Sequence, residues 1–60
     1  MKRRDLIKKI EAQGAVFLRH GGKHDWYQNT TTKVCQPVPR HNEINEHLAR
    51  NILRKLSPKA

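Results

Sequence analysis

The sequence predicts an α+β domain in which two helices flank a three-stranded antiparallel sheet, in the order α-β-β-β-α. Two segments with helical spacing of apolar residues lie near the ends of the chain, and three short strand-like segments separated by turn residues lie between them. Each helical segment has one apolar stripe, so we expect both helices on one face of the sheet and the other face open. A chain of 60 residues has no room for a second domain or a deep substrate cavity.

The first helix is predicted from about residue 2 to residue 13. Leu6, Ile7 and Ile10 recur there at helical spacing among charged residues. Gly14 follows directly, at the position where left-handed backbone commonly ends a helix.

A hairpin is predicted next. Residues 15–19 form its first strand and residues 23–28 its second. The Gly21-Gly22 pair between them suits the positive φ angles of a tight turn.

The register of this hairpin decides which side chains share a face of the sheet. With a two-residue loop at the glycine pair, Arg19 is expected to face His24, and Phe17 to face Trp26. Trp26 and Tyr27 are adjacent in a strand and point to opposite faces, so at least one of them is expected in the core.

The third strand is predicted at residues 33–38, after a polar connection at residues 29–32. Pro37 and Pro39 confine it to a sheet edge or end it, because proline cannot donate a hydrogen bond to a neighbouring strand. A loop at residues 40–44 follows.

The second helix is predicted to begin after Asn45, whose side chain can cap it, with Glu46 in the first turn. Ser57-Pro58 ends it. Its apolar stripe consists of Leu48, Ile52, Leu53 and Leu56.

The charge of the chain indicates an anionic partner. It has 13 Lys and Arg against 5 Asp and Glu, a formal charge of +8. Nucleic acid is the first candidate and an acidic protein the second. For helix-borne cations such as Lys8 and Lys9, contact with phosphates and a merely solvated helix face are both open interpretations.

The apolar runs and the single cysteine indicate in which cellular compartment the protein is expected. The longest apolar run, residues 15–18, is too short for a signal sequence or a membrane span, and Cys35 alone cannot form an intrachain disulfide. We therefore expect a cytoplasmic protein with no membrane partner.

His24 is the residue best suited to chemistry. It directly follows the Gly21-Gly22-Lys23 turn, a cationic and sterically open corner. An imidazole can take a proton from a ribose 2′-hydroxyl or give one to a leaving 5′-oxygen, so RNA cleavage there needs no metal. An exposed turn histidine without a catalytic role is the competing interpretation.

Other chemistry finds little support in the sequence. His20, His24, Cys35 and His41 do not have the spacing of a metal site, and a structural zinc site usually draws on two or more cysteines. We expect no metal site, and we expect Cys35 to be a small buried residue in a strand.

The chain resembles the HicA toxin family over about residues 2–56. The resemblance lies in the basic start at residues 2–9, in Gly14, in the run from residue 19 to residue 27 and in residues 38–41. Its most specific part is the Gly-Gly-x-His-x-x-Tyr run that ends at Tyr27.

This resemblance implies one HicA-like domain over residues 1–60 with a fold similar to a double-stranded RNA-binding domain. It implies a bacterial type II toxin that cleaves mRNA and halts translation, with no cofactor and with His24 as the catalytic residue. The implied partner is a HicB-type antitoxin, so we expect a monomer when free and a hetero-oligomer in the complex. The residues expected to bind RNA are Arg19, Lys23, Lys8, Lys9, Arg40 and Trp26.

The chain departs from the family pattern in two places. Lys23 stands where many members have a small residue such as serine, and residues 42–46 lack a Pro-Gly-Thr-like helix start. His41 is open to interpretation as a second proton-transfer group or as an exposed loop histidine. A noncatalytic RNA-binding module of the same fold remains the alternative function.

Overall fold

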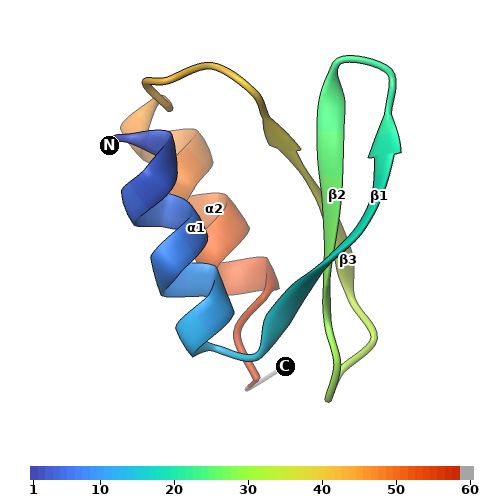
Figure 1. Cartoon of the computed structure of the whole chain (residues 1–60). Helices are drawn as coiled ribbons and strands as arrows, with labels where there is room; N and C mark the ends of the chain where they lie inside the picture. Colours follow the sequence, from blue (N-terminus) through green and yellow to red (C-terminus); the bar gives the residue numbers. More distant parts are fainter. Residues whose placement is uncertain (59–60) are drawn as a thin grey trace.

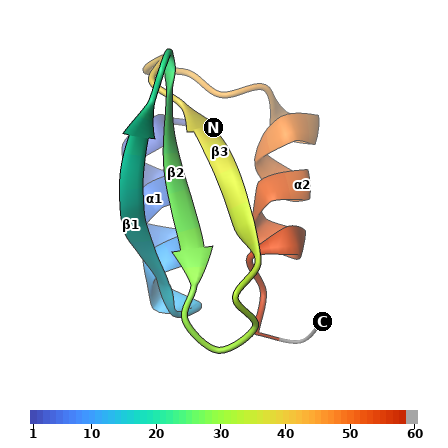
Figure 2. The same ribbon diagram turned by 90° about the vertical axis from the view of Figure 1, so that its right-hand side faces the viewer.

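The structure of the chain is a computed structural model that describes residues 1–58. Helix and strand order is α-β-β-β-α, as predicted, and the antiparallel sheet has the order β1-β2-β3. Both helices lie on one face of this sheet and leave its other face uncovered (Figures 1 and 2). The elements are α1 (Arg3–Ala12), β1 (Ala15–Gly21), β2 (His24–Asn29), β3 (Cys35–Pro39) and α2 (Glu46–Lys55).

Local signals set the helix ends as predicted. The Asn45 side chain accepts hydrogen bonds from the backbone N–H groups of His47 and Leu48, so it caps the first turn of α2. Gly14 has a φ of +99° directly after the end of α1, a conformation that a residue with a side chain adopts only at a cost.

The core lies between the helices and the sheet. The predicted stripe of α1 supplies Leu6 and Ile10, whereas Leu48 of α2 is 40% exposed and does not belong to the core. The fully or nearly fully buried apolar residues are Leu6, Ile10, Ala15, Tyr27, Val38, Ile44, Ala49, Ile52 and Leu56.

One buried polar side chain, Asn29, ties three parts of the fold together. Its amide nitrogen donates to the carbonyl oxygens of Gln13 and Leu56, at the ends of the two helices. Its amide oxygen accepts from the backbone N–H groups of Thr31 and Thr32, in the turn that leads to β3. Asn29 is fully buried, and these four bonds satisfy its polar atoms.

The hairpin register differs from the prediction. The loop is Gly22-Lys23, and Gly21 belongs to β1, where it pairs with His24. Only Gly22 of these two loop residues has a positive φ, at +56°, so a single glycine suffices for the turn.

The predicted cross-strand pairs are therefore wrong. Arg19 pairs with Trp26, and a bulge at Leu18 then places Phe17 opposite Tyr27. Residue 21 has no space for a side chain in this strand, because a Cβ atom there would lie 2.5 Å from Nε1 of Trp26. The absence of a side chain at residue 21 makes room for the indole, which the turn chemistry alone did not indicate.

β3 is an edge strand, as its prolines predicted, and it pairs only with β2. Tyr27 is buried under the helices, and its neighbour Trp26 lies on the open face, as expected for adjacent strand residues. The prediction of a buried Cys35 is wrong: it is half-buried and pairs with Gln28 on the open face, which no helix covers. Among residues 1–58, no helix is long and apolar enough to cross a membrane.

Candidate functional site

The hairpin end positions His24. This residue starts β2 directly after the Gly22-Lys23 loop, and its cross-strand partners are Gly21 on one side and Pro39 on the other. The imidazole is exposed, and no hydrogen bond to it occurs within residues 1–58. The side chain is therefore accessible to a substrate.

Arg19 and Trp26 lie on the same open face of the sheet as His24. The guanidinium carbon of Arg19 is 5.8 Å from the centroid of the Trp26 ring, within the range of a cation–π contact. Although Arg19 does not pair with His24, the observed register still brings Arg19, Trp26 and His24 to one face. An aromatic ring and a guanidinium beside an imidazole can contact a base and a phosphate, respectively.

A hollow of about 330 Å³ lies beside the hairpin loop and is lined by Gly22, Lys23, Arg40 and His41. Two cations, Lys23 and Arg40, therefore converge at this end of the sheet, and Lys23 directly precedes His24 in the chain. Cations around a shallow hollow suit a phosphate group. His41 is exposed here, which fits both interpretations of this residue.

Lys8 and Lys9 are separated from this hairpin end. Both are exposed on α1, which packs on the helix-covered face of the sheet, whereas His24 lies on the open face. The structure does not bring these two lysines together with His24, so a role for them requires that RNA extends around the domain.

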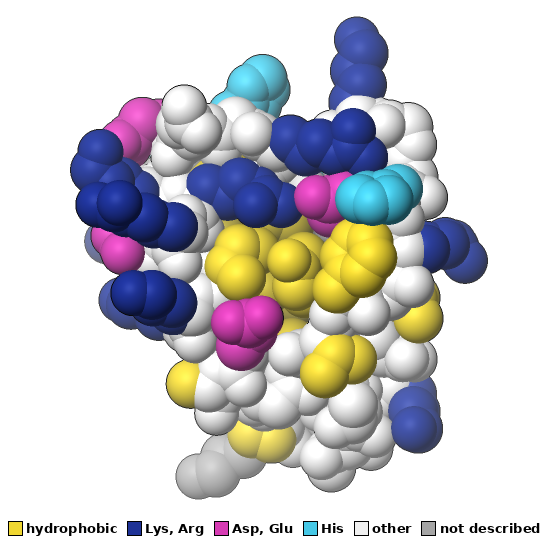
Figure 3. All heavy atoms as spheres, viewed as in Figure 1, with side chains coloured by type: hydrophobic (Ala, Val, Ile, Leu, Met, Phe, Trp, Pro, Cys, Tyr) yellow, Lys and Arg dark blue, Asp and Glu magenta, His cyan; other side chains and the backbone are white. Residues whose placement is uncertain are grey.

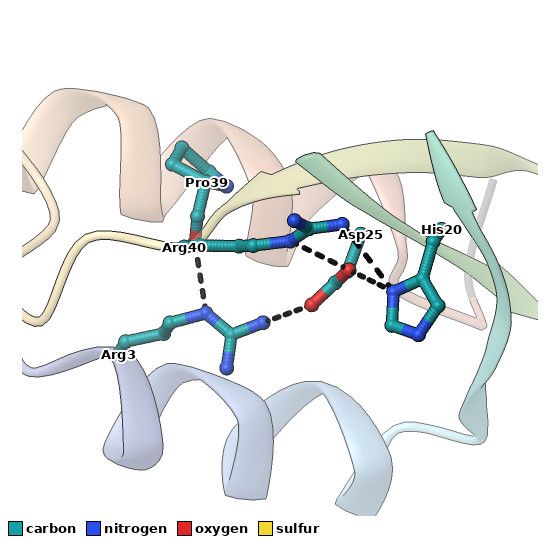
Figure 4. A network of polar contacts seen from close by, with 5 residues as sticks. All are labelled: Arg3, His20, Asp25, Pro39 and Arg40. Carbon is teal, nitrogen blue, oxygen red and sulfur yellow. Dashed lines mark hydrogen bonds and ion pairs between the residues drawn. The ribbon is translucent and has the colours of Figure 1, made fainter. Parts of the chain in front are cut away.

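A polar cluster around Asp25 was not predicted from the sequence. Oδ1 of Asp25 lies 2.7 Å from Nδ1 of His20 and 3.0 Å from Nε of Arg40, and Oδ2 lies 2.9 Å from a terminal nitrogen of Arg3 (Figure 4). Arg3 also donates from Nε to the carbonyl oxygen of Pro39 at 2.8 Å. The carboxylate is only 13% exposed and lies on the helix-covered side of the hairpin.

The cluster determines the charge of Asp25 and the tautomer of His20. The hydrogen bond from His20 lowers the pKa of Asp25, burial opposes this, and the Arg40 guanidinium lowers it further. An ionised carboxylate only accepts hydrogen bonds, so Nδ1 of His20 carries the proton and Nε2 faces away from it. The contact of 3.3 Å between Arg40 and the same Nδ1 is then a close approach and not a hydrogen bond.

The sequence could have indicated this cluster through the pairing of His20 with Asp25, but only with the correct hairpin register. With the loop at Gly22-Lys23, His20 and Asp25 become direct cross-strand partners. The predicted register paired His20 with Lys23 and thereby hid the pair. Arg3 and Arg40 lie far from the hairpin in sequence, and no local pattern links them to it.

The side chains that commonly bind metals in proteins are those of Asp, Glu, His and Cys. Within residues 1–58, no group of three or more such side chains is placed to hold a metal ion.

Comparison with known proteins bears on the identity of the chain. A family model described as the HicA toxin of bacterial toxin-antitoxin systems matches residues 3–57. Searches of curated proteins and of solved structures gave no match. The family match spans almost every described residue. The chain belongs to the HicA toxin family of bacterial toxin-antitoxin systems.

Proposed function

We propose that this toxin is a metal-independent endoribonuclease that cleaves mRNA in the cytoplasm and thereby inhibits translation. The observation that carries the proposal is the exposed His24 imidazole at a hairpin end where Lys23 and Arg40 line a hollow. The family membership and the formal charge of +8 support RNA as the substrate.

His24 is the proposed proton-transfer residue. Its neutral imidazole takes the proton of a ribose 2′-hydroxyl, and the 2′-oxygen then attacks the adjacent phosphorus. The bond from phosphorus to the 5′-oxygen breaks, and that oxygen takes a proton from water or from a protonated imidazole. The products are a 2′,3′-cyclic phosphate and a free 5′-hydroxyl.

Cations stabilise the charge that develops on the phosphoryl oxygens. Lys23 precedes His24 in the chain, and Arg19 lies on the same face of the sheet. Trp26 offers a ring on which a base can stack, and Arg40 extends the cationic surface into the hollow. Lys8 and Lys9 add affinity for RNA that does not depend on sequence.

The proposed protein partner is a HicB-type antitoxin, because the family belongs to toxin-antitoxin systems. An antitoxin that covers the hairpin end would block access to His24. We propose a free monomer and a hetero-oligomeric complex with the antitoxin.

A noncatalytic RNA-binding module is the second candidate. One observation favours it: within residues 1–58 no hydrogen bond orients the His24 imidazole. Catalytic side chains are commonly oriented by a neighbouring group, although substrate itself can complete such geometry.

The experiment compares the wild-type chain, His24→Ala and a matched control, His47→Ala, which removes an exposed histidine from α2. Each purified protein is incubated with a long mRNA in EDTA after circular dichroism has shown that it is folded. We expect cleavage by the wild type and by His47→Ala, with fragments ending in cyclic phosphate, and none by His24→Ala.

Other outcomes would change the proposal in defined ways. Cleavage only when a divalent metal is restored would overturn metal independence. Intact RNA with all three proteins, together with equal RNA binding, would favour the noncatalytic module. Cleavage by His24→Ala at the wild-type rate would remove His24 from the mechanism.

A further inference from the structure

The helix-covered side of the hairpin carries an exposed aromatic residue next to the Asp25 cluster. Phe17 is 46% exposed although its strand partner Tyr27 is buried. Its ring centroid lies 4.9 Å from that of His20 and 5.8 Å from that of Tyr27. Figure 3 shows apolar side chains exposed between α1 and the sheet, with basic side chains, a carboxylate and a histidine along their upper border.

The polar groups beside Phe17 carry a net positive charge. Arg3 and Arg40 contribute two positive charges and Asp25 one negative charge, so the cluster has a charge of +1 with neutral His20 and +2 when His20 is protonated. Arg40 is 46% exposed and uses Nε for Asp25, which leaves its terminal nitrogens available to an anion. The cluster therefore suits one phosphate group.

Arg40 connects this cluster to the hairpin end. Its guanidinium bonds Asp25 on the helix-covered side, and the same residue lines the hollow with Lys23 and His41. A strand of RNA bound at the hollow would therefore meet Phe17 and His20 on the far side of Arg40.

We propose that Phe17, His20 and Arg40 form a binding site for one nucleotide of single-stranded RNA, outside the site of cleavage. The base stacks on Phe17, and the adjoining phosphate contacts the terminal nitrogens of Arg40. Nε2 of His20 faces the same phosphate and donates to it only when the ring is protonated. Stacking on an aromatic ring tolerates any base, and the cationic cluster supplies the charge complement to the phosphate. This inference rests on RNA being the substrate.

Charged and aromatic groups surround His20 on the helix-covered side of the hairpin. Asp25 and Arg40 contact its Nδ1, Arg3 reaches the same carboxylate from α1, and Phe17 lies beside its ring. Protonation of Nε2 adds a donor and a positive charge that face the phosphate.

The test measures the affinity of each variant for a fluorescein-labelled 2′-O-methyl oligonucleotide of eight adenosines, which the proposed mechanism cannot cleave. Phe17→Leu keeps an apolar side chain but removes the ring, and Leu48→Ala on the exposed side of α2 is its control. Arg40→Gln is compared with Arg54→Gln, which removes one exposed charge from α2. We expect roughly 5- to 20-fold weaker binding for Phe17→Leu and for Arg40→Gln than for their controls.

The outcomes separate this inference from the proposed function. If the wild type does not bind the oligonucleotide, RNA as the substrate is in doubt. If it binds and cleaves RNA but Phe17→Leu matches its control, the nucleotide site is wrong and the proposed function stands, because only Arg40 belongs to both sites. If the two variants bind RNA normally and lose affinity for the antitoxin, this face is a protein interface and the inference is overturned.

Discussion

At the scale of the residue, Asp25 determines how the hairpin end is held. One carboxylate receives hydrogen bonds from β1, from α1 and from the residue after β3, through His20, Arg3 and Arg40. These contacts hold the exposed side chains of His20 and Arg40 and add to the bond between Arg3 and the Pro39 carbonyl. Asp25 is therefore a positioning residue for the cations of the hairpin end.

Asp25 makes stability depend on pH in a predictable direction. Its pKa is lowered in the folded chain from an ordinary value of 3.8, so its contribution to folding is fully present above pH 4 and is lost as the pH falls through the folded pKa. We expect Asp25→Asn to be less stable than the wild type at pH 7, with a smaller difference at pH 3. Urea unfolding at the two pH values measures this.

The control for this prediction is Asp5→Asn, which alters a carboxylate exposed on α1 that makes no side-chain hydrogen bond or ion pair within residues 1–58. Because Asp5 lies in the first turn of α1, where a negative charge is favourable, this variant should lose less stability than Asp25→Asn at pH 7 and follow the wild type at pH 3. Equal stability of Asp25→Asn and the wild type at pH 7 would show that the cluster does not stabilise the fold.

At the scale of the element, the ends of both helices are joined to the sheet through Asn29. The last carbonyl groups of a helix have no hydrogen-bond donor within the helix and need one from elsewhere. The carbonyl oxygens of Gln13 and Leu56 both accept a hydrogen bond from the buried side-chain amide of Asn29. This contact fixes where α1 and α2 end relative to β2.

We expect Asn29→Ala to lower the free energy of unfolding by about 3 kcal/mol, because it leaves the buried carbonyl of Leu56 and the part-buried carbonyl of Gln13 without their donor. Gln28→Ala is the matched control: this neighbour lies on the open face and makes one side-chain hydrogen bond, to Lys33. Its expected cost is below about 1 kcal/mol. Urea unfolding measures both, and a cost for Asn29→Ala no larger than that of the control would contradict this account.

At the scale of the whole molecule, positive charge surrounds a small domain whose two helices carry many of the cations. The formal charge of +8 on 60 residues makes RNA affinity depend strongly on salt, because each phosphate contact releases counterions. The salt dependence therefore reports which cations touch RNA.

The double change Lys8→Gln and Lys9→Gln tests whether RNA extends around the domain to α1. If both lysines contact phosphates, the slope of log affinity against log salt falls by roughly 1.4 in magnitude for a single strand. The control, Arg54→Gln with Lys55→Gln, removes two exposed charges from α2. Gel-shift titrations at several salt concentrations measure the slopes, and equal slopes for the two double variants would argue against a specific path along α1.

The sequence by itself determined the element order, the Asn45 cap, the left-handed Gly14 and the edge position of β3. Each of these rests on residues close together in the chain, so local preferences suffice to predict them. The exposed position of His24 followed in the same way from the adjacent turn.

Only the tertiary structure decided the hairpin register and the Asp25 cluster. The loop sits one residue later than predicted, so Gly21 lies in β1, where its lack of a side chain leaves room for Trp26 on the neighbouring strand. The cluster joins Arg3, His20 and Arg40, which lie on three different segments. Contacts between distant segments depend on how helices and sheet pack, and no periodicity within one segment encodes that.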